Sequence, residues 1–160
     1  MTKAGLIAIA LMGVAATASA APQCYRANEA EAEQAMRYQA KLMVLSDTCH
    51  SSSYNTFVNR NRSLIIYYQH ALIDWFRKLE GRHAEDAFDR YQTKLANQYA
   101  LGAGNTPVAT LCGQSAAFLD QARDFRAEDF RHYITHTAVE ERTSYPRCTE
   151  ESAEAVRASR

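Results

Sequence analysis

Two histidines four residues apart, His132 and His136, are the residues whose spacing could most directly support chemistry. Positions i and i+4 share one face of a helix, so both imidazoles could bind a single metal ion. His83 lies in an expected turn at the same end of the domain and could complete a surface zinc or copper site. Because paired histidines are common by chance, a solvated helix end is the competing interpretation.

Other signatures of catalysis or cofactor binding are incomplete. The runs 80–83 and 129–132 resemble the Glu-x-x-His ligands of di-iron bundles, but Gly81 breaks the first run at a helix end. Cys49 and His50 lack the first cysteine of a Cys-x-x-Cys-His haem site. The chain has no Gly-x-Ser-x-Gly nucleophile motif. These patterns favour a binding protein without a cofactor over an enzyme, and a zinc or copper protein is the alternative.

The first 20 residues have the pattern of a secretory signal peptide. Lys3 precedes an apolar run over residues 4–16, and Ala18 and Ala20 stand at the −3 and −1 positions of a cleavage site. The run is shorter than the ~20 residues that span a bilayer, which argues against an N-terminal anchor. We therefore expect a single mature domain over residues 21–160, periplasmic or secreted and not inserted in a membrane.

The charge balance excludes some classes of partner. The chain has 18 Lys and Arg residues against 18 Asp and Glu residues, and the two signs are mixed along its length. A near-neutral chain of this kind gives no electrostatic basis for binding nucleic acid or anionic lipid. The expected partner is a protein, either an unknown one or a second copy of this chain.

Apolar residues recur with the 3.6-residue period of a helix in four segments. Asn28 and Glu31 form a capping pair at the start of the first segment. After His136 the period fades, so residues 136–160 are expected to form an irregular tail. Short connections favour antiparallel neighbours, hence an all-α, up-down-up-down four-helix bundle. The expected helices cover about 28–49, 53–80, 84–101 and 106–125, with an extension of the fourth through Ile134.

The helix pattern selects one pairing of Cys24, Cys49, Cys112 and Cys148. About 25 residues, at about 1.5 Å each, hold Cys24 and Cys49 more than roughly 30 Å apart, which is too far for a disulfide. In the bundle, Cys49 and Cys112 lie at one end, and Cys24 and Cys148 lie at the other. We therefore predict Cys49–Cys112 and Cys24–Cys148 bridges, which are structural because no Cys-x-x-Cys motif is present.

The second predicted helix contains five consecutive apolar or aromatic residues, 64–68. At about 100° per residue this run covers the whole helix circumference, whereas a surface helix leaves one side polar. Two explanations stay open: the fold covers this helix on all sides, through its C-terminal segment, or Ile66 and Tyr67 contact a partner.

Three stretches carry a resemblance to known proteins: residues 41–44 leading to Cys49, residues 54–58, and residues 91–97 before Cys112. In them the chain resembles small exported helical proteins of unknown function from Gram-negative bacteria. The resemblance implies a periplasmic setting and supports the Cys49–Cys112 bridge, and it implies no catalytic or binding residues.

The sequence thus predicts an exported helical domain that acts by binding a protein partner or by self-association. A metal-binding protein or metal-dependent enzyme that uses His132, His136 and His83 is the first alternative. A carrier of a small apolar ligand, held between the aromatic-rich helices, is the second.

Overall fold

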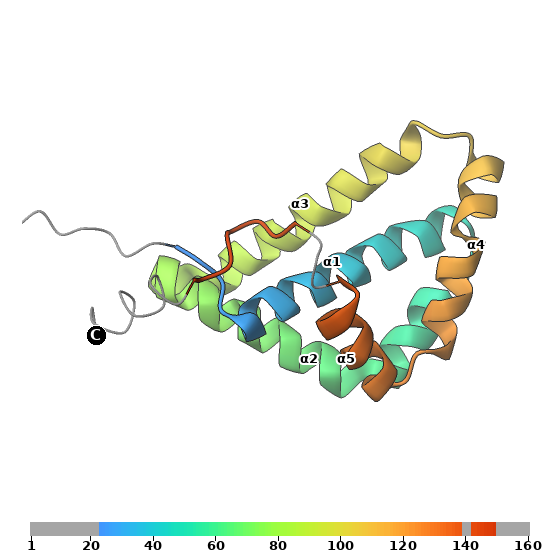
Figure 1. The fold of residues 1–160 in the computed structure, drawn as a ribbon. Helices are drawn as coiled ribbons and strands as arrows, with labels where there is room; N and C mark the ends of the chain where they lie inside the picture. The colour runs from blue at the N-terminus through green and yellow to red at the C-terminus, as the bar shows by residue number, and fades with distance from the viewer. Residues whose placement is uncertain (1–22, 139–141, 150–160) are drawn as a thin grey trace, which may run out of the picture.

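The computed structural model describes residues 23–138 and 142–149. The predicted signal peptide and the rest of the tail lie outside the described residues. The helices are α1 (Ala27–Thr48), α2 (Ser53–Glu80), a short 3-10 helix η1 (Gly81–His83), α3 (Ala84–Gly104), α4 (Val108–Asp124) and α5 (Ala127–His136) (Figure 1). The prediction of an all-α four-helix domain with two disulfides is confirmed. No helix in the described part of the chain is long and apolar enough to cross a bilayer.

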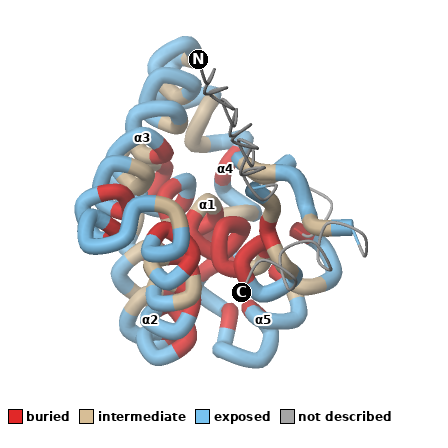
Figure 2. The backbone as a smooth tube through the Cα atoms, turned by 90° about the vertical axis from the view of Figure 1, so that its left-hand side faces the viewer, coloured by how far each residue is buried: buried red, intermediate tan, exposed pale blue. Residues whose placement is uncertain are grey.

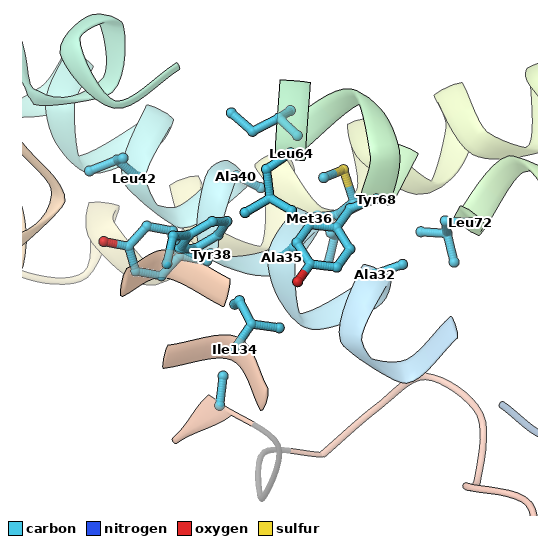
Figure 3. Packing of buried hydrophobic residues seen from close by; sticks show 14 of the residues in the cluster. Ala32, Ala35, Met36, Tyr38, Ala40, Leu42, Leu64, Tyr68, Leu72 and Ile134 are labelled. Atoms are coloured by element: carbon cyan, nitrogen blue, oxygen red, sulfur yellow. The ribbon is translucent and has the colours of Figure 1, made fainter. Parts of the chain in front are cut away.

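Helix α1 lies at the centre of the arrangement and contacts α2, α3, α4 and α5. Helices α1, α2 and α3 run back and forth along one another, and α4 crosses the end where α1 stops (Figure 1). The small side chains Ala32, Ala35 and Ala40 are buried on α1, so its neighbours can approach closely. The buried residues therefore concentrate around α1 (Figure 2), where they pack against Tyr68 and Leu72 of α2 (Figure 3).

The predicted extension of the fourth helix is a separate helix, α5. The helix is interrupted at Phe125 and Arg126, which have extended ψ values of 123° and 168°. The Asn61 amide on α2 donates to the Phe125 carbonyl at 3.1 Å and to the Phe57 carbonyl at 2.9 Å. The break lets α5 turn back against α1 and α2, where Phe130 is fully buried.

Helix α1 is capped differently from the prediction. It begins at Ala27, and the Glu29 carboxylate accepts a hydrogen bond from the Arg26 backbone N–H at 2.8 Å. The predicted pair of Asn28 and Glu31 is therefore wrong. Glu29 is buried and also forms an ion pair with Lys78 of α2, so one carboxylate caps α1 and ties it to α2.

Both predicted disulfides are confirmed. The Cα atoms of Cys24 and Cys148 are 5.0 Å apart, and those of Cys49 and Cys112 are 5.5 Å apart. The bridges join residues 124 and 63 positions apart. In the chain-entropy model each is worth about 4–5 kcal/mol, comparable to the whole stability of a small domain. Disulfides of this kind indicate folding in an oxidising, non-cytoplasmic environment.

Candidate functional site

A groove lies between α2 and α3, with α1 as its floor. Its wider part has a volume of about 780 Å³ and lies at the end of α1, beside the α3–α4 connection. A second part of about 450 Å³ lies between α1, α2 and α3. Because Met43 and Tyr54 line both parts, they form one continuous surface, here named the α1–α3 groove.

Small side chains on α3 produce this groove. Thr93, Ala96, Ala100 and Ala103 line it, and their spacing of three or four residues places them on one face of the helix. Side chains of this size cannot fill the space between α3 and α1. Helix α3 also draws away from α1 toward the end where α4 begins (Figure 1), which is where the wider part of the groove lies.

The groove combines apolar surface with acidic side chains. Met43 is 38% exposed and Val108 is 57% exposed, and both line its wider part. Asp47 and Asp89 are exposed at its two parts, and neither forms an ion pair with any residue described in the structure. The described residues that line it include no lysine or arginine. The groove therefore combines apolar and polar side chains with an excess of negative charge.

A polar group in the groove also has unused hydrogen-bonding capacity. Gln39 donates its Nε2–H to the Tyr54 hydroxyl at 3.3 Å. Its Oε1 atom is buried and has no hydrogen-bond partner within residues 23–138 and 142–149. A buried carbonyl oxygen without a partner costs about 1–3 kcal/mol, so a donor that entered here would be favoured.

His50 lines the wider part of the groove and has a backbone φ of +50°. It follows α1 in a Schellman motif, because the Ser51 N–H donates to the Ser46 carbonyl at 2.8 Å and the His50 N–H donates to the Asp47 carbonyl at 3.2 Å. Glycine is usual at this position, since L-residues pay a steric cost in the left-handed region. A strained residue at the edge of a groove points to a functional use of its side chain.

The structure brings together two of the three histidines predicted to bind metal. The His132 and His136 rings stack with centroids 4.1 Å apart on the exposed side of α5. His83 lies in η1, which contacts α2 and α3 but not α5. The Arg82 guanidinium donates from Nε to its Nε2 at 3.2 Å, and an Asp86 carboxylate oxygen lies 3.6 Å from its Nδ1. Within the described residues, no three His, Cys, Asp or Glu side chains are grouped to hold a metal ion.

The predicted contact residues Ile66 and Tyr67 are 39% and 50% exposed. The fold does not cover this helix on all sides, because α5 packs against α2 beside the buried Tyr68 while Ile66 and Tyr67 are exposed to solvent, and their contact with a partner stays a prediction. The Arg131 guanidinium of α5 lies 5.6 Å from the centre of the Tyr67 ring. Neither Ile66 nor Tyr67 lines the α1–α3 groove.

A buried carboxylate, Glu33, holds the C-terminal segment against α1. It accepts hydrogen bonds from the Ser144 backbone N–H at 2.9 Å, from the Ser144 hydroxyl at 2.6 Å and from the Tyr91 hydroxyl at 3.1 Å. Arg37 pairs with it at 2.7 Å. Burial raises the pKa of Tyr91, and the Glu33 charge raises it further. These hydrogen bonds and the ion pair with Arg37 hold Ser144 of the C-terminal segment against α1.

The sequence interpretation missed the groove and Glu33. Ala96, Ala100 and Ala103 are a readable signal for a cleft, since their spacing places small side chains on one face of a helix, about a quarter turn from its larger apolar residues. Glu33 gave no signal, because its donor Ser144 lies 111 residues away. Comparison of the chain with protein-family models, curated proteins and solved structures finds no match in any of the three.

Proposed function

We propose that this protein is a non-enzymatic binding domain, periplasmic or secreted, whose α1–α3 groove binds a segment of a partner protein. The observation that supports this proposal best is the continuous groove itself, which has an apolar wall and two acidic side chains without ion-pair partners in the described structure. Its two adjoining parts, of about 780 and 450 Å³, give room for several side chains of a helix or an extended peptide, and each part alone has the size of a small-molecule site.

The chemistry of the groove defines the partner segment. Covering Met43 and Val108 removes apolar area from water, which is worth at most about 1.5–3 kcal/mol for each side chain because both are already partly buried. Asp47 and Asp89 favour lysine or arginine at matching positions, although each exposed ion pair adds only about 0–1 kcal/mol. The expected partner segment is therefore apolar and basic, its affinity is modest, and its association rate falls as salt increases.

A peptide selection tests this proposal. A library of random 15-residue peptides displayed on phage is selected against the oxidised protein, and chosen peptides are synthesised for titration calorimetry. Ala100→Trp blocks the groove at an exposed position of α3, and Ala116→Trp makes the same change at an exposed position of α4 outside the groove. We expect apolar peptides with Lys or Arg, whose binding is lost with Ala100→Trp and kept with Ala116→Trp. Acidic peptides, or equal binding by both variants, would contradict the proposal.

Two other functions remain alternatives. The stacked pair His132 and His136 would support metal binding, with zinc or copper as the candidates, if a further ligand came from outside the described residues or from a partner. A small apolar ligand could instead occupy the groove. Native mass spectrometry of the exported protein separates these functions. A metal ion that is retained by the protein and lost when both histidines are replaced would support metal binding. A co-purifying small molecule would support a ligand carrier, and either result would contradict the peptide proposal.

A further inference from the structure

A second, smaller pocket lies on the opposite side of α1 from the groove. Its α1 residues Arg37, Tyr38 and Lys41 lie about half a turn around the helix from Gln39 and Met43, which face the groove. Tyr99 of α3, Phe118 of α4 and Tyr133 of α5 complete its walls. Its volume is about 170 Å³. We name it the Tyr38 pocket.

Tyr38 lines this pocket, and its hydroxyl is buried without a hydrogen-bond partner among the described residues. The residue is only 5% exposed, and its ring extends from α1 across α5 (Figure 3). Burial raises the pKa of Tyr38, and the neighbouring Tyr133 raises it further, so the phenol stays protonated. Tyr38 therefore has an O–H group whose capacity to donate a hydrogen bond is unused among the described residues.

The charges at this pocket are positive. Arg37 donates from Nε and Nη2 to the Glu33 carboxylate, which leaves Nη1 without a hydrogen bond in the described structure. The Lys41 ammonium lies 4.8 Å from the centre of the Phe118 ring and has no ion-pair partner in the same part of the chain. Among the described residues, no carboxylate lines the pocket. Its lining therefore carries donors and cations, and the group they favour is an anionic acceptor.

The walls and the volume define the rest of the ligand. The Tyr38 ring lies 4.9 Å from the Phe118 ring and 5.5 Å from the Tyr133 ring, measured between centroids, so the walls are aromatic. A cavity of about 150 Å³ is known to hold one benzene molecule, and the Tyr38 pocket is of similar size. We propose that the Tyr38 pocket binds a small organic carboxylate with a single ring, whose carboxylate meets Lys41 and the Tyr38 hydroxyl.

Titration calorimetry with benzoate as the probe tests this site on the intact oxidised protein. Tyr38→Phe removes only the hydroxyl, and Tyr68→Phe removes another buried hydroxyl without a partner in the described structure that does not line the pocket. Lys41→Met removes the cation, and Lys94→Met is the control at an exposed lysine of α3. We expect saturable binding of one benzoate, weakened about tenfold by Tyr38→Phe and by Lys41→Met, since a hydrogen bond or contact to a charged group is lost.

The controls and two further probes decide the outcome. The proposal requires Tyr68→Phe and Lys94→Met to bind benzoate as the unaltered protein does, and benzyl alcohol, which lacks the charge, to bind more weakly. Absence of saturable benzoate binding, or equal weakening by a variant and its control, would overturn the proposal. Inorganic phosphate that binds as tightly as benzoate would also overturn it, because the site would then recognise an anion without using its aromatic walls.

Discussion

Replacing His50 with glycine is expected to stabilise the domain by about 0.5–1 kcal/mol, although the histidine lines the α1–α3 groove. The φ of +50° places His50 in the left-handed region, where an L-residue costs about 1–2 kcal/mol more than glycine. The greater freedom of glycine in the unfolded chain offsets about 0.5–1 kcal/mol of that gain. For a domain of this size, each kcal/mol added to the free energy of unfolding raises Tm by about 2–4 °C.

The matched control is His70→Gly. His70 is exposed in the interior of α2, where the same chemical change replaces histidine by the poorer helix former and costs a few tenths of a kcal/mol. Urea denaturation of both variants under oxidising conditions should therefore give shifts of opposite sign. A destabilisation of His50→Gly equal to that of His70→Gly would refute the argument that His50 is strained.

The same variant links stability to the proposed function. If the strain at His50 is retained because its imidazole contacts the partner, His50→Gly should bind the selected peptide more weakly while it unfolds at a higher temperature. Unchanged binding by a stabilised variant would show that the strain has no part in recognition.

Three other predictions follow from buried polar groups. Asn61→Ala should lower the free energy of unfolding by about 2 kcal/mol, because the Phe57 and Phe125 carbonyls lose their shared donor, and the exposed control Asn59→Ala should change urea denaturation little. Glu33→Gln should lower the free energy of unfolding by about 2–3 kcal/mol in the same assay, which is less than the loss of a fully buried ion pair because Arg37 reaches solvent. The control Glu31→Gln should change it by no more than about 0.5 kcal/mol, and equal effects of the two variants would contradict the role of Glu33 in holding the C-terminal segment. The folded state raises the pKa of Tyr68 to about 12, and burial raises that of Tyr91 also, so their contribution to stability is complete below about pH 10. Above pH 10 the native state retains protons that the unfolded chain releases, so stability should fall by about 1.4 kcal/mol per pH unit for each such tyrosine; a flat profile to pH 11 would contradict the burial.

The helices and disulfides could be predicted because they depend on local patterns and on simple lengths. The apolar period defines each helix, and the rise of about 1.5 Å per residue excludes a bridge between Cys24 and Cys49. The break between α4 and α5 depends instead on Asn61, which donates to Phe125 from another helix. No glycine or proline occurs between Leu119 and Thr143, so the local sequence gives no stop signal at this break.

The groove could not be predicted because it is defined by side chains that are small. Periodicity identifies what fills a core, whereas Ala96, Ala100 and Ala103 matter through the space they leave beside α1. The left-handed conformation of His50 could not be predicted from the sequence either, because glycine is the usual residue at such a position and no glycine directly follows α1. The burial of Glu33 could not be predicted either, because it depends on a C-terminal segment that the Cys24–Cys148 bridge joins to the start of the domain.

The measurement that tests the central claim most directly is a methyl NMR titration of the exported protein labelled at its methionine methyl groups. After removal of residues 1–20, the chain retains two methionines, Met36 and Met43. Met43 is 38% exposed in the α1–α3 groove, and Met36 is fully buried in the core. On addition of a selected basic, apolar peptide, we expect the Met43 signal to shift saturably and the Met36 signal to move much less. A Met43 signal that stays in place while calorimetry shows the peptide bound would contradict binding in the groove.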